Sequence, residues 1–201
     1  MKFLEDPYKT LAAGFGVTGV LAVAWVLMVG VPEGGAWVEQ LVRWTHFLAG
    51  ITWIGLLYFF NLINAGFLKS LDAGQKGVVI PRLMPNALWW FRHGATVTVL
   101  AGILLYVLQY RKGGTGAIAL GIGGLLGLIM MANVHAIIWP CQRRIIAVTK
   151  EAADTGKPPS KEVADEVAAL GRKALMASRI NFMLSIPMLF FMGAGSHLPV
   201  K

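Results

Sequence analysis

The 201-residue sequence has few charged residues and a single cysteine. Charged residues make up 14% of the chain and hydrophobic residues 56%, whereas a soluble domain usually carries about 25% charged residues. This composition excludes a soluble enzyme and a disordered chain. A lone cysteine, Cys141, cannot form an internal disulfide, so a secreted disulfide scaffold is excluded as well.

Acidic residues are missing from the middle of the long apolar segments. All ten Asp and Glu lie in loops, at the expected interfaces or in the charged segment near residue 160. A proton pump or proton-coupled transporter needs an acid inside the membrane, so this absence counts against both. The sequence also lacks the Glu-x-x-His pattern of di-iron bundles, the C-x-x-C-H of covalent c-type haem and any nucleophile–base arrangement.

Five apolar runs are each long enough to cross a bilayer, which takes roughly 20 residues. The first could be a signal peptide, but it is long and no A-x-A cleavage site follows it, so we interpret it as a span. We therefore expect residues 1–201 to form a single all-α integral membrane domain, a bundle of five transmembrane helices. The predicted spans are 11–31, 38–68, 83–110, 116–146 and 178–198.

The net charge of +8 has a topological interpretation. Lys and Arg concentrate in the segments 69–82 and 143–179, and positive residues mark cytoplasmic loops. We therefore expect a cytoplasmic N-terminus, an external C-terminus and no nucleic-acid partner. The positive residues expected on the external side are Arg43, Arg111, Lys112 and Lys201.

Residues 147–177 are predicted to form a cytoplasmic helical hairpin between the fourth and fifth spans. Gly156, Pro158 and Pro159 end the first helix, and Ser160 is a suitable N-cap for the second. The second helix is amphipathic and is expected to run directly into the fifth span. A solvated extension is the simplest role for it.

Four histidines lie on four different apolar segments: His46, His93, His135 and His197. An ionisable residue within a membrane is costly to bury without a partner, so it indicates a functional site. At a rise of 1.5 Å per residue, His93 and His135 are expected roughly 10–12 Å inside the cytoplasmic face. His46 and His197 are expected near the outer face. The sequence thus predicts an inner and an outer histidine pair.

Two imidazoles on facing helices at matched depth are what bis-histidine ligation of haem b requires. His93 and His135 are the predicted axial ligands, and His46 with His197 would be a second pair, so one or two haems are expected. Glycines near His135 leave room for a macrocycle, although Gly123 and Gly127 fit ordinary helix packing equally well.

Copper binding by methionine and histidine is a weaker alternative, since Met in apolar helices is usually filler. The methionines concerned are Met130, Met131, Met188 and Met192.

Two arginines lie near the predicted inner pair. Arg92 precedes His93, and Arg179 opens the fifth span. Either could pair with haem propionates or hold an anionic, planar substrate, whereas Arg143 and Arg144 are expected to snorkel to the headgroups. Polar stripes containing His46 with Asn61 and Asn64, and His93 with Asn86 and Thr96, are expected to face the bundle interior.

Four segments of the chain carry a family resemblance: WTHFLAGITWIGLLYFFN (44–61), PNALWWFRHGA (85–95), NVHAIIWPCQRR (133–144) and SRINFMLSIPMLFFMGAGSH (178–197). In these segments the chain resembles the urate oxidase N-terminal domain family, the membrane portion of bacterial urate oxidases that carry a C-terminal cytochrome c. The resemblance implies a multi-helix domain of the bacterial inner membrane linked to oxidation and electron transfer. This sequence holds no C-x-x-C-H, so the electron acceptor is expected to be a separate protein.

The leading hypothesis from the sequence is a haem b-binding electron-transfer protein or a subunit of a membrane redox complex. One alternative is a membrane oxidoreductase that oxidises urate or a similar purine at a pocket formed by Arg92 and Arg179. Another is an accessory subunit of a respiratory complex in which the histidines are merely hydrogen-bonded. Expected partners are the lipid bilayer, a cytochrome c or a respiratory complex, and a further copy of the chain.

Overall fold

The computed structural model describes residues 2–32, 34–110 and 115–197, and every secondary-structure element in those ranges is helical. Five helical segments are long and apolar enough to cross a membrane, which confirms the predicted number and type of element. They are Pro7–Val29, Ala36–Ser70, Ala73–Leu108, Gly116–Thr155 and Lys161–His197. Arg111, Lys112 and Lys201, and the last residue of the predicted span 178–198, lie outside the described ranges.

The chain divides into two compact units, residues 1–40 and 41–201. The first unit contains a short 3₁₀ helix, η1 (Lys2–Glu5), the helix α1 (Pro7–Val29) and the beginning of α2 (Ala36–Tyr58). No residue of α1 is buried, although its composition is strongly apolar. Within this unit, the rings of Trp25 and Trp37 meet edge to face with their centroids 5.8 Å apart.

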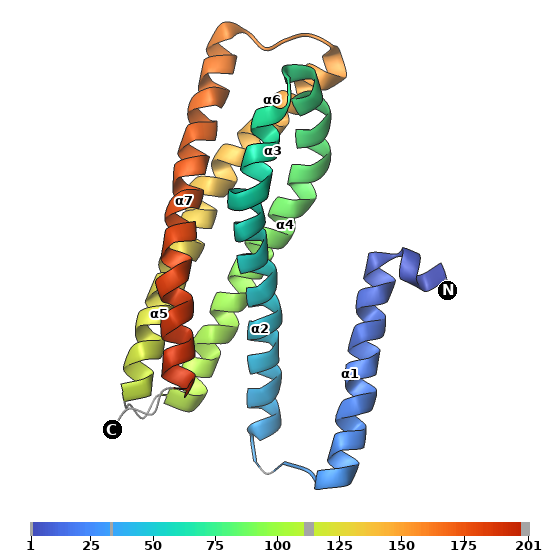
Figure 1. Ribbon diagram of the computed structural model, residues 1–201, viewed down its shortest axis with the longest axis vertical. Coiled ribbons are helices and arrows are strands. Elements are labelled where there is room, and N and C mark those ends of the chain that lie inside the picture. Colours follow the sequence, from blue (N-terminus) through green and yellow to red (C-terminus); the bar gives the residue numbers. More distant parts are fainter. Residues whose placement is uncertain (1, 33, 111–114, 198–201) are drawn as a thin grey trace. The chain divides into compact units, whose positions relative to one another are not determined.

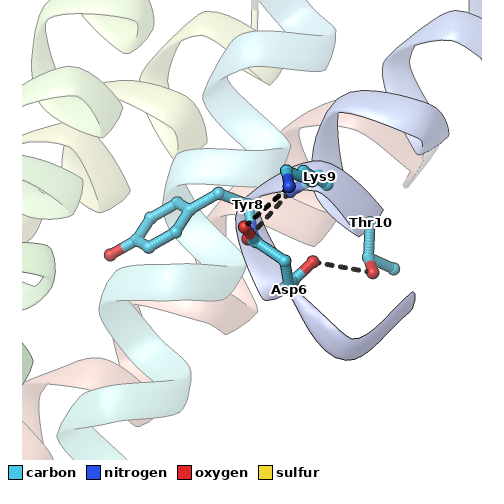
Figure 2. A network of polar contacts seen from close by, with 4 residues as sticks. All are labelled: Asp6, Tyr8, Lys9 and Thr10. Carbon is cyan, nitrogen blue, oxygen red and sulfur yellow. Dashed lines mark hydrogen bonds and ion pairs between the residues drawn. The ribbon is translucent and has the colours of Figure 1, made fainter. Parts of the chain in front are cut away.

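The start of α1 is set by an N-cap (Figure 2). One carboxylate oxygen of Asp6 accepts from the backbone N–H groups of Tyr8 and Lys9 at 2.9 and 3.2 Å, and the Thr10 hydroxyl donates to the Asp6 carbonyl. These bonds satisfy N–H groups that have no partner inside the helix. Pro7 stands at the first helical position, where its missing N–H costs nothing.

The second unit is a bundle of long helices (Figure 1). The helix α2 continues through a π-helical segment, η2 (Phe59–Asn64), into α3 (Ala65–Ser70), and α4 (Ala73–Leu105) continues into η3 (Tyr106–Tyr110). The helices α5 (Thr115–Asn133), η4 (Val134–Ile138) and α6 (Trp139–Thr155) form one continuous rod. The helix α7 (Lys161–His197) packs along α5 and α6, and α4 packs against the same two helices.

The core of this bundle lies where α2, α4, α5, η4 and α7 meet. Its largest fully buried side chains include Trp53, Leu57, Phe91, Met130 and Val134. A glycine permits the close approach of α2 and α4, because a Cβ at Gly94 would lie 3.3 Å from the backbone nitrogen of Trp53. The expected packing role of Gly123 is also found, since a Cβ there would lie 3.2 Å from the Met188 carbonyl oxygen of α7.

The predicted hairpin is helical on both sides of its loop. The first helix ends at Thr155, with Gly156 in the left-handed conformation at φ 65°, and the backbone N–H of Val163 donates to the Ser160 hydroxyl at 3.4 Å. The fifth apolar segment has no break at its expected start, because α7 runs from Lys161 to His197 without interruption. Its 37 residues correspond to about 55 Å, well beyond the hydrocarbon thickness of about 30 Å.

An ion pair joins the two helices of the hairpin. Arg144 Nε and Nη2 donate to the two carboxylate oxygens of Glu166 at 3.0 and 2.9 Å, so Arg144 has a protein partner in place of the expected headgroup. Both side chains are more than two-fifths exposed. We expect Arg144→Ala to lower the Tm only slightly, because exposed ion pairs contribute little to stability.

The measurement is thermal unfolding in detergent at low and at high salt. The small difference from the native protein should vanish at about 1 M salt, where the Debye length is about 3 Å. Arg143→Ala is the matched control, because Arg143 is exposed and forms no ion pair with another described residue. A large Tm loss that persists at high salt would contradict this assignment.

Candidate functional site

Asparagine and serine side chains form a hydrogen-bonding network in the interior of the bundle, in two parts that no hydrogen bond between described residues joins. Asn133 Nδ2 donates to Asn181 Oδ1 at 2.7 Å and to the Ala177 carbonyl at 2.8 Å. Asn181 Nδ2 in turn donates to the Met130 carbonyl at 3.0 Å. These bonds tie α5 to α7 and satisfy most of the polar groups that this pair of helices buries.

The second part of the network connects α7 to η2. Asn61 Nδ2 donates to the Ser178 hydroxyl and to the Leu57 carbonyl, each at 2.8 Å. Asn61 and Asn64 are buried, as expected for the polar stripe of the second predicted span. Their Oδ1 atoms have no hydrogen-bond partner among the described residues.

The predicted polar stripe of α4, which contains Asn86 and His93, faces away from the bundle interior. His93 is partly exposed and Asn86 is exposed, so the expectation that they face the interior was wrong. The buried residues of α4 include Met84, Leu88 and Phe91, which define its core-facing side. His93 follows Phe91 by two positions, a rotation of about 200° on an α-helix, and therefore lies on the outer side.

The ring of His93 is held in one tautomer. Its Nδ1 lies 2.8 Å from the Trp89 carbonyl oxygen, and the ring stacks on the Trp89 indole with centroids 4.2 Å apart. A carbonyl oxygen can only accept, so Nδ1 carries a proton, and in the neutral ring the lone pair is on Nε2. A ring nitrogen anchored to a backbone carbonyl is the usual arrangement of a metal-ligating histidine.

His135 lies beside His93 on the same outward face of the bundle. Thr96, one turn after His93, brings its hydroxyl oxygen to 2.9 Å from His135 Nε2. The same hydroxyl donates to the Arg92 carbonyl at 3.0 Å. Since a hydroxyl has a single proton, Thr96 accepts from His135 Nε2–H, and the lone pair of His135 is on Nδ1. Arg92 and His93 both interact electrostatically with the His135 ring.

Arg92 does not extend freely toward the membrane surface. The central carbon of its guanidinium lies 4.1 Å from the ring centroid of Trp139, which is a cation–π contact. Trp139 follows His135 by four residues and Trp89 precedes His93 by four, spacings that place side chains on neighbouring turns. These two tryptophans were not among the predicted site residues, although the spacing was visible in the sequence.

The position of His135 coincides with an irregular stretch of helix. His135 belongs to the π-helical segment η4, in which the hydrogen bonds run from i to i+5. Such a segment changes the angular register of the residues that follow it. His135 follows Asn133 by two residues and so lies on the other side of the helix: Asn133 bonds to α7, while His135 faces outward toward Thr96.

The outer histidines occupy two different environments. His46 is partly buried against α4, where its Nδ1 lies 2.8 Å from the Thr98 carbonyl, so Nε2 carries its lone pair. Gly102 leaves room for this ring, because a Cβ there would lie 3.0 Å from His46 Cε1. His197 is exposed in the last turn of α7, and Arg179 is exposed on the same helix.

Within the described ranges, no group of three or more His, Cys, Asp and Glu side chains could hold a metal ion. A haem needs only two protein ligands, so this finding does not bear on the histidine pairs. Met130 and Met188 are buried in the core, as expected of filler residues.

Comparisons of the chain with protein-family models, curated proteins and solved structures found no match. The function must therefore be inferred from the chemistry of these residues.

Proposed function

We propose that this is a multi-pass membrane protein that binds haem b through His93 and His135 and transfers electrons within a larger redox assembly. The observation that carries the proposal is the placement of two histidines with oriented lone pairs on one face of the bundle. His93 offers Nε2, and His135 offers Nδ1, or Nε2 after release of Thr96. Neutral imidazoles of this kind are the usual axial ligands of b-type haem.

The surroundings of the two histidines fit an anionic, flat group. Arg92 lies within electrostatic range of His135 and could pair with a carboxylate of the macrocycle. The Trp89 and Trp139 rings border the same face and provide flat apolar surface. A bound haem would supply one-electron exchange, and the protein would contribute the two nitrogens, the positive charge and the apolar walls.

The exposure of this face supports membership of an assembly. His135 is exposed, and polar side chains at the depth of a membrane are seldom left facing lipid. A neighbouring subunit or a redox partner such as a cytochrome c would cover the site and exchange electrons with it. His46, whose Nε2 also carries a lone pair, and His197 would provide a second site.

The membrane orientation is part of the proposal. The five apolar helices would cross the bacterial inner membrane with the N-terminus in the cytoplasm and the C-terminus outside. What supports this orientation is the concentration of Lys and Arg at 69–82 and 143–179. The resemblance of 44–61, 85–95 and 133–144 to the urate oxidase N-terminal domain family supports the link to oxidation.

The deciding experiment is the visible spectrum of the protein purified from membranes grown with a haem precursor. We expect a Soret band that sharpens on reduction with dithionite, and haem b released by acid extraction. A protein that is folded and monodisperse but yields neither a Soret band nor extractable haem would overturn the proposal. Reduction of an added cytochrome c by urate-treated membranes would instead favour the purine-oxidising alternative.

A further inference from the structure

A groove with a volume of about 520 Å³ runs between α2 and α4. It is more open than enclosed. Five of the lining residues come from α4, and three come from the facing part of α2. They are Arg82, Leu83, Asn86, Ala87 and Trp90 from α4, and Thr52, Gly55 and Leu56 from α2.

The α4 side of the groove changes from charged to apolar along its length. Arg82, Asn86 and Trp90 are spaced by four residues, so they form a single row about 12 Å long. The row begins with a guanidinium, continues with a carboxamide and ends with an indole. It therefore offers an anion site at one end and an apolar surface at the other.

The polar groups at the start of the row are available to a ligand. Neither Arg82 nor Asn86 forms a hydrogen bond or an ion pair with another described residue, and both are exposed. Across the groove, Gly55 has no side chain to occupy the space, and a Cβ at that position would meet nothing within 4 Å. The Thr52 hydroxyl donates to the Leu48 carbonyl at 2.9 Å and retains its lone pairs for an incoming donor.

We propose that this groove binds an anionic phospholipid, with the phosphate at Arg82 and an acyl chain along Leu56 and Trp90. A guanidinium can bind phosphate through two parallel hydrogen bonds. Basic pockets between transmembrane helices at the cytoplasmic side are a recurrent form of anionic-lipid site. Arg82 is the last residue of the basic segment 69–82, most of which forms the beginning of α4, and the charge distribution assigns this segment to the cytoplasm.

The open side of the groove favours a lipid over a soluble planar anion. Sites for small solutes usually bury about 70–90% of the ligand, which an open groove does not do. A phospholipid has no such requirement, because the rest of its surface is covered by neighbouring lipids. The inference rests on the membrane insertion in the proposed function, but it does not depend on haem binding.

The test is native mass spectrometry of the purified full-length chain exchanged into mixed micelles. The probes are phosphatidylglycerol and phosphatidylcholine with identical acyl chains. We expect the native protein to retain phosphatidylglycerol preferentially, and Arg82→Gln to reduce that preference about five-fold, which corresponds to the roughly 1 kcal/mol of one basic residue at a membrane surface. Lys69→Gln is the matched control, because it removes one exposed positive charge near the same end of the bundle without touching the groove.

A second variant tests the apolar part of the groove. Gly55→Leu has space for its side chain and should reduce retention of both lipids, while the elution volume and Tm remain those of the native protein. Equal retention of the two lipids by the native protein, or equal effects of Arg82→Gln and Lys69→Gln, would overturn the proposal. Displacement of the lipid by glycerol 3-phosphate would reassign the site to a soluble phosphate, and displacement by urate to a planar purine anion. Either result would also overturn it.

Discussion

Replacement of His93 by alanine is expected to reduce the haem content of the purified protein by at least about ten-fold, since even residues that only orient a metal ligand change metal binding by 10–100-fold. The physical reason is the loss of the nitrogen whose lone pair is directed outward by the bond from Nδ1 to Trp89. His135→Ala should have the same effect through the loss of the second ligand. Haem per protein is measured by the pyridine haemochrome assay on protein of known concentration.

The control for His93 is Val97→Ala. Val97 lies one turn further along α4 and is 41% exposed, so its truncation changes the same face without removing a ligand. The native haem content should be retained. If His93→Ala and His135→Ala both kept the native content and spectrum, these residues would not be the ligands. If His46→Ala alone abolished the Soret band, the haem would belong to the outer histidine instead.

Asn181→Ala is expected to lower the free energy of unfolding by about 1–3 kcal/mol. Asn181 is fully buried, accepts from Asn133 and donates to the Met130 carbonyl. The alanine variant leaves a small cavity and deprives a buried amide of one acceptor. Interhelical hydrogen bonds in membranes average only about 0.6 kcal/mol, so most of the expected loss comes from the unfilled space and the unpaired groups.

The measurement is reversible unfolding in mixed micelles with increasing denaturing detergent. Ile180→Ala is the matched control, because Ile180 is the preceding residue on α7 and is 49% exposed. It should change stability much less than Asn181→Ala. Equal effects of the two variants would mean that the asparagine network contributes no more than an ordinary surface contact.

The predictions that depended on local sequence were confirmed. The apolar runs are helices, Ser160 caps the second helix of the hairpin, and Gly156 ends the first. These features depend on interactions within a few residues of each other. The N-cap at Asp6 and the capping box of Asp72 with Gln75 were not predicted, although they too are formed by residues only two or three positions apart.

The predictions that depended on a helix face were only partly right. The stripe of Asn61 and Asn64 is buried, but the stripe of Asn86 and His93 is not. Both stripes contain polar residues at helical spacing, so periodicity does not distinguish them. What separates them is that η2 presents its polar side to α7, through Asn61 and Ser178, whereas α4 presents Phe91 and Leu88 to the core.

The amino-acid sequence alone predicts five long apolar helices that have no acid in their middle, and it places one histidine on each of four of them. Hydrophobic length and the positions of charges are local properties, so they need no knowledge of neighbouring helices. The packed bundle was needed to show that His93 and His135 share an outward face linked by Thr96, and that a groove opens beside Arg82. Those outcomes depend on how each helix is rotated against its neighbours. That rotation is set by packing across the bundle and by the π-helical segments, which change the register of the side chains that follow them.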